Sequence, residues 1–191
     1  KRWVMVHKKD QTTLSGINEV PTFAKTTPIA DVIHIPTIKT VDTNATGGKY
    51  FFEDYVAGER LNHPEGITID NSDHTLATKL YQNNAKVHMM KSTPMGQRLM
   101  YGGIIISTAR AISFNGLQNA QWMYAINSGA HANPTYAGDT IYAYTEIIET
   151  IEVNREDIGL LRLRTVGIKN QTAKEIENPK SEDGKYLPNV V

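Results

Sequence analysis

The sequence contains no cysteine, no excess charge of either sign and no long apolar run. Without cysteine the chain has no disulfide framework, no thiolate metal ligand and no cysteine nucleophile, which leaves the redox compartment open, with the reducing cytoplasm as the default expectation. Its 20 Lys and Arg residues are balanced by 20 Asp and Glu residues, which argues against nucleic acid as a partner, because such binding needs clustered positive charge. Apolar runs such as Ile104–Ile106 are far shorter than the roughly 18 residues of a membrane span. The sequence therefore predicts neither a nucleic-acid partner nor a membrane span.

Composition divides the chain into three parts. Residues 1–9 include the strand-like Trp3–Val6, which has no partner nearby and is interpreted as the final strand of a preceding domain. Residues 10–48 are rich in Thr, Pro and Asn, which predicts a linker over the surface. Residues 49–191 have the composition of one packed domain.

Two helices are expected in the first half of this domain. Polar residues at 71–73 are suited to cap a helix, and Leu76 and Leu80 follow on one face, which predicts a helix over residues 73–84. A second helix is expected to follow Gly102–Gly103 and to end at residues 115–116. Its isoleucines indicate that it is buried.

Strands are expected later in the domain, because the apolar period changes from 3.6 to 2. Alternation at residues 140–147 and 161–165 predicts two antiparallel strands, and the polar turn at 154–157 joins them in a hairpin. A short edge strand is expected near Arg60. Helices followed by strands indicate the α+β class.

Two tracts carry residue types suited to chemistry on a thioester. An amide at Asn83 lies five residues before His88, whose side chain is suited to accept a proton from water and to return it. Gly102 and Gly103 lead into a helix N-terminus, whose amides can hold a thioester oxygen as it becomes an enolate. The residues alone leave simpler interpretations open: His88 as an ordinary surface or core histidine, and the glycines as a point of close packing.

Several tracts of the sequence resemble a known family. They are Tyr50–Tyr55, Val56–Glu59, the tract that ends at His88, Tyr101–Gly103 and Tyr136–Thr140. Together they resemble the MaoC-like hydratases of the hot-dog superfamily. Residues 77–83, 125–129 and 157–166 are most similar to the C-terminal half of the members that act on mesaconyl-CoA. The likeness covers nearly the entire chain.

This resemblance implies a fold and an activity. The fold is an antiparallel sheet wrapped around a central helix, here the one with Leu76 and Leu80, as the C-terminal half of a double hot-dog protein. Residues 1–9 would end the first half, and the chain would lack the last strand of the second, which exposes a sheet edge. The activity is reversible hydration of a branched C5-dicarboxylic CoA thioester, mesaconyl-CoA to β-methylmalyl-CoA. No cofactor beyond the coenzyme A of the substrate is implied, and a homo-oligomer is expected through sheet pairing.

The resemblance also implies roles for individual residues. His88 and Gly102 match the positions of the family's catalytic histidine and its oxyanion amide. Asn83 stands where the wider family has Asp, a departure that fits the mesaconyl-CoA members, since an amide orients a water but cannot return a proton. Gly103 would line the substrate site. Three cations, Lys86, Lys91 and Arg98, would meet coenzyme A phosphates or a substrate carboxylate, or else form solvated surface.

Other expectations follow from what the tracts lack. The six histidines are scattered without the i, i+4 spacing of a helical zinc site, so no metal is expected. The tract at residues 88–91 is shorter than in the related sequences, through a natural deletion or missing residues. Two alternatives to a hydratase stay open, a hot-dog thioesterase and a non-catalytic half that supports a partner domain. The lack of an acidic residue at position 83, where Asn83 stands, favours the non-catalytic half.

Overall fold

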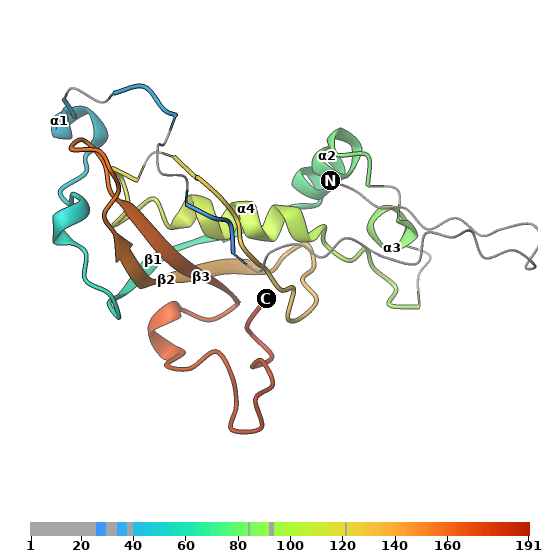
Figure 1. The fold of residues 1–191 in the computed structure, drawn as a ribbon. Helices are drawn as coiled ribbons and strands as arrows, with labels where there is room; N and C mark the ends of the chain where they lie inside the picture. The colour runs from blue at the N-terminus through green and yellow to red at the C-terminus, as the bar shows by residue number, and fades with distance from the viewer. Residues whose placement is uncertain (1–25, 30–33, 38–39, 84, 92–93, 121) are drawn as a thin grey trace, which may run out of the picture.

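The computed structural model describes residues 26–29, 34–37, 40–83, 85–91, 94–120 and 122–191. Three antiparallel strands form one sheet in the order β1–β2–β3. They are β1 (Arg60–Thr68), β2 (Thr140–Ile151) and β3 (Leu160–Lys169). The helices are α1 (Thr43–Thr46), α2 (Asn71–Leu80), α3 (Lys86–Met89) and α4 (Gly102–Ile112), with single 3-10 turns at Phe52–Asp54 and Ala173–Glu175. In Figure 1, α4 lies along the sheet, whereas α2 and α3 lie beyond one end of it.

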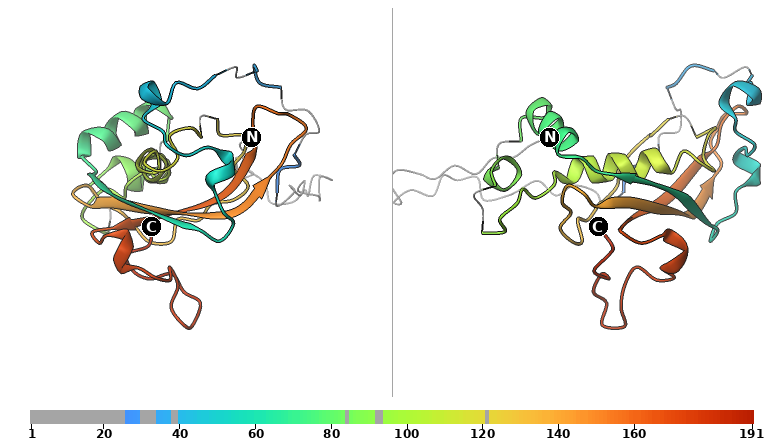
Figure 2. Two further views of the ribbon diagram at one scale, coloured as in Figure 1. Left: turned by 90° about the vertical axis from the view of Figure 1, so that its left-hand side faces the viewer. Right: turned by 180° about the vertical axis from the view of Figure 1, so that it is seen from behind.

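The main core lies between α4 and the sheet. Ile105, Ala109 and Ile112 project from one side of α4, at the spacing of one helical face, and are buried. They pack with Ile141 and Ala143 of β2. Seen end-on in the left view of Figure 2, the sheet curves beneath this helix. The predicted arrangement of an antiparallel sheet wrapped around a helix is therefore confirmed.

The identity of the central helix differs from the expectation. Leu76 and Leu80 of α2 are 60% and 67% exposed, so the prediction that their helix is the central one is wrong. The buried positions of α2 are instead His74 and Thr78. The physical reason is apolar content: α4 carries four isoleucines, whereas α2 carries two leucines among mostly polar residues, so burying α4 removes more apolar surface from water.

The predicted hairpin is formed by β2 and β3, which pair from Ile141 opposite Lys169 to Ile151 opposite Leu160. Successive side chains alternate between two faces. Tyr144 faces away from α4 and packs with the C-terminal segment, which lies on the opposite side of the sheet (Figure 2). The guanidinium of Arg60 lies 3.6 Å from the centre of the Tyr144 ring. The hairpin thus supports a packed layer on each face.

The boundaries predicted before residue 49 remain predictions. The strand expected at Trp3–Val6 and much of the linker expected at 10–48 lie outside the described residues. The short helix α1 begins where the Asp42 side chain accepts a hydrogen bond from the Asn44 amide. Close to the other end of the chain, the Val191 amide donates to the Gly167 carbonyl over 3.0 Å, so residues 189–191 pair with the outer edge of β3.

Candidate active site

His88 is held by the one-turn helix α3. The turn before this helix is closed by Asn83, whose side-chain oxygen accepts a hydrogen bond from the Ala85 amide over 3.3 Å. The His88 ring nitrogen Nδ1 lies 2.8 Å from the Leu99 carbonyl oxygen. Because a carbonyl only accepts, Nδ1 carries the proton and Nε2 presents a lone pair. The structure therefore gives His88 the tautomer that a general base requires.

Two aromatic rings flank the His88 imidazole. The centre of the His74 ring lies 6.1 Å from that of His88 at 76°, and the Tyr101 ring lies 6.1 Å away at 73°. Both contacts are edge-to-face. Tyr101 is also the residue that precedes α4, so the histidine lies beside the N-terminus of this helix. The structure thus brings two of the predicted tracts together.

Two glycines begin α4, and each is packed closely against an aromatic side chain. A side chain at Gly102 would collide with the imidazole of His131. A Cβ at Gly103 would lie 2.6 Å from Cε1 of Tyr101. The close-packing interpretation of these glycines is therefore supported. It is compatible with an oxyanion site, because the first amides of a helix point away from its body.

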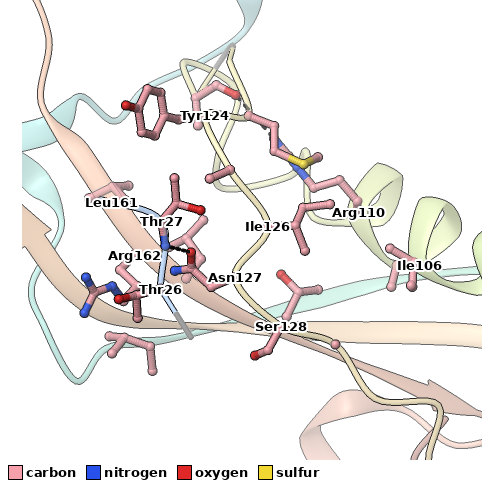
Figure 3. Close-up of a pocket in the computed structure, with 18 of the residues that line it drawn as sticks. Thr26, Thr27, Ile106, Arg110, Tyr124, Ile126, Asn127, Ser128, Leu161 and Arg162 are labelled. Carbon is pink, nitrogen blue, oxygen red and sulfur yellow. Dashed lines mark hydrogen bonds between the residues drawn. The ribbon is translucent and has the colours of Figure 1, made fainter. Parts of the chain in front are cut away.

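His131 is a residue of this region that the sequence did not single out. Its ring covers Gly102 although it lies 29 positions later in the chain, so no local spacing relates the two. The ring is exposed. The segment with Tyr124, Ile126 and Ser128 runs beside α4 (Figure 3). The packing of this segment places His131 against Gly102.

His74 was also not predicted as part of the site. Its ring is 0% exposed, and neither nitrogen has a hydrogen-bond partner among the residues that the structure describes. Burial lowers the pKa of His74 to about 4, helped by the positive charge of Arg98 and by His88. The buried His63 differs, because its Nδ1 donates to the Asn115 carbonyl and its Nε2 accepts from the Thr145 hydroxyl, both over 2.9 Å.

Acid should destabilise the fold through His74. In the unfolded chain this imidazole takes up a proton near the ordinary histidine pKa of 6.5, whereas the folded protein resists protonation until the pH approaches its lowered pKa of about 4. The stability that depends on a neutral His74 is therefore complete above pH 6.5 and is lost as the pH falls toward 4. We expect wild type to lose about 2 kcal/mol more unfolding free energy than His74→Phe between about pH 7 and about pH 4.5, measured by urea denaturation. Equal losses would show that His74 is not the group responsible.

The three predicted cations have different surroundings. Arg98 binds α2, since its Nη1 donates to the Thr75 hydroxyl over 3.0 Å and its Nη2 donates to the Asn71 side-chain oxygen over 2.9 Å. It therefore ties the segment before α4 to α2. Lys86 and Lys91 are exposed near His88 in the sequence. Within the described ranges, no group of three or more His, Asp or Glu residues is placed to hold a metal ion.

A groove of about 590 Å³ lies between α4, β3 and residues 122–131. Its walls include Ile105 and Ile106, and His131 lies among its lining residues. Neither Asn83 nor His88 lines it. Residues 26 and 27 of the same chain lie in the groove, where the Thr27 amide donates to the Asn127 side-chain oxygen over 2.7 Å (Figure 3). The groove therefore reaches the start of α4 through His131, but it does not include Asn83 or His88.

Comparison with known proteins finds two related sequences. The chain is 44% identical over 193 residues to mesaconyl-CoA hydratase of Cereibacter sphaeroides. It is 42% identical over 197 residues to beta-methylmalyl-CoA dehydratase of Chloroflexus aurantiacus. Both matches include all of this chain, which spans 56% of the length of each relative. No family model matches the sequence.

A solved structure is similar over the same extent. The crystal structure described as a MaoC domain dehydratase from Chloroflexus aurantiacus matches with a TM-score of 0.85 and 40% identity. The match covers 97% of this chain and 55% of that one.

Among the described residues, no helix is long and apolar enough to cross a membrane.

Proposed function

The chain belongs to the MaoC-like hot-dog family, and on that premise we propose that it forms the C-terminal half of an enzyme that reversibly hydrates mesaconyl-CoA to β-methylmalyl-CoA. The observation that carries the proposal is the 44% identity with mesaconyl-CoA hydratase, which extends over all of this chain. The chain covers only part of that relative, so the activity is assigned to the full-length protein. The tautomer of His88 and its position beside the α4 N-terminus suit this reaction.

The proposed reaction uses His88 for both proton transfers. Nε2 takes a proton from water, and the hydroxide adds to the β-carbon of the enoyl thioester. The electron pair of the double bond moves to the thioester oxygen, where the Gly102 amide holds the enolate. The imidazolium then returns its proton to the α-carbon, so water is added overall and the histidine is restored.

In the same proposal, the other candidate residues orient the water and bind the CoA thioester. Asn83 orients the water with its side chain, and Gly103, packed against the Tyr101 ring, lines the substrate site at the start of α4. Lys86 and Lys91, both exposed, attract coenzyme A phosphates. Arg98 acts through α2, to which it is bound, and adds positive charge beside the site.

The first test is an assay of the full-length protein with mesaconyl-CoA. We expect the absorbance of the conjugated enoyl thioester to fall without release of free thiol, because water adds to the double bond and leaves the thioester intact. A constant enoyl signal with thiol release, detected by a thiol reagent, would instead assign a thioesterase. No change in either signal would favour a non-catalytic hot-dog half.

The assembly state and location belong to the same proposal. We propose a homo-oligomer that acts in the cytoplasm. A partner surface is supported by the exposed apolar side chains of α2, Leu76 and Leu80. A cysteine-free chain is compatible with the reducing cytoplasm.

A further inference from the structure

His74 is the buried titratable residue for which the proposed reaction has no use. The structure describes two buried histidines, and only His63 has partners for both ring nitrogens. Both nitrogens of His74 are buried and unpaired among the described residues. Such a group is less favourable in a protein interior than an apolar ring of similar size. Stability therefore does not explain a histidine at this position of α2.

The surroundings of His74 connect it to the candidate base. Its ring meets the His88 imidazole edge-to-face, with centres 6.1 Å apart. Within the part of the chain that the structure describes, one side-chain hydrogen bond holds His88, the one from Nδ1 to the Leu99 carbonyl, so packing contacts set the tilt of the imidazole about that bond. Tyr101 and His74 both supply ring contacts of this kind.

The charge near His74 also favours an uncharged ring. Arg98 and His88 are the groups whose positive charge acts on His74, from the segment before α4 and from α3. A proton on His74 would face both of them in a buried environment. When His88 becomes an imidazolium during the reaction, the neighbouring ring is therefore a neutral polar group.

We propose that His74 is a positioning residue for His88. It holds the imidazole with Nδ1 on the Leu99 carbonyl and Nε2 directed to the reacting water, and its neutral polar ring stabilises the transient imidazolium. This inference rests on the proposed hydratase function. Because His74 acts through His88, its replacement should change catalysis and not substrate binding.

The test compares His74→Phe and His74→Leu with wild type in the full-length protein. We expect kcat for mesaconyl-CoA to fall about 10- to 100-fold in His74→Leu, with KM changed less than about twofold, because the base is misplaced but the substrate contacts remain. His74→Phe, which keeps an edge-to-face ring without nitrogens, should be intermediate. The melting temperature of both variants should be equal to or above that of wild type, because the unpaired polar atoms are gone. The exposed His34 offers a matched control, and His34→Leu should leave kcat unchanged.

A second measurement separates this inference from the hydratase proposal. In ¹⁵N NMR spectra of the substrate-free protein, wild-type His88 should show a protonated Nδ1 and an unprotonated Nε2, whereas His74→Leu should show averaging between tautomers. If wild type has no hydratase activity but this change occurs, the positioning role stands and the proposed function fails. The inference is overturned if the His88 signals are unchanged, or if kcat falls only in parallel with the melting temperature.

Discussion

Replacing His88 by alanine is expected to lower kcat for hydration of mesaconyl-CoA by about 100- to 10,000-fold, the usual range for loss of a general acid-base group. The reason is that one side chain performs both proton transfers in the proposed reaction. Its Nε2 is available for this because Nδ1 is occupied by the Leu99 carbonyl, 2.8 Å away. The measurement is the rate of loss of enoyl-thioester absorbance in the full-length protein.

Two controls make this result specific to the proton transfers. His34→Ala removes an exposed histidine far from the candidate site in sequence and should keep the wild-type rate. KM for His88→Ala should change little, since in the proposed reaction the imidazole contacts the reacting water and not the coenzyme A part. If His88→Ala keeps most of the wild-type rate, the assignment of the base is wrong.

The second large effect concerns stability and the identity of the central helix. Ile105 is 5% exposed and packs in the core between α4 and β2. Truncation to alanine should lower the free energy of unfolding by about 2–5 kcal/mol, because the transfer free energy of the removed carbons is lost and a cavity is left. Urea denaturation of wild type and variant, with equal m-values, measures this difference.

The chain offers two matched controls for this substitution. Ile106 is the next residue of the same helix and is 48% exposed, so Ile106→Ala should cost less than about 1 kcal/mol. Leu80→Ala on α2 should cost a similarly small amount, since that side chain is 67% exposed. If Leu80→Ala lowers the free energy of unfolding as much as Ile105→Ala does, then α2 and not α4 is the central helix.

The surroundings of His88 suggest that its environment is built for function at some cost in stability. His74 buries two nitrogens beside it that are unpaired among the described residues, whereas His63, elsewhere in the core, has both nitrogens bonded. Departures from full pairing in a buried region are typical of functional sites. Replacing His74 should therefore raise stability and lower kcat together, because the same buried polar ring destabilises the fold and supports catalysis.

Local sequence patterns by themselves determined the strands, the hairpin and the position of the second helix. Alternation at residues 140–147 predicts a strand with one face on the core and one in water, and β2 forms there. The exposure of its second face was predicted wrongly, because Tyr144 is buried against the C-terminal segment. The tracts around His88 and Gly102 were likewise recognisable, because each one is a short run of neighbouring residues. The roles of these site residues stay predictions until the variants are measured.

Only the tertiary structure decided which helix is central, what lies against His88 and what covers Gly102. The isoleucines of residues 104–112 indicate a buried helix, but a 3.6-residue period does not show which surface covers an apolar face. The sequence therefore left open that the helix with Leu76 and Leu80 is the one inside the sheet, whereas in the structure that place belongs to α4. The contacts of His74 with His88 and of His131 with Gly102 join separate elements, and no local spacing encodes them. They depend on how the sheet, α2 and residues 122–131 pack around α4, because that packing minimises exposed apolar surface over the whole domain and not within any single segment.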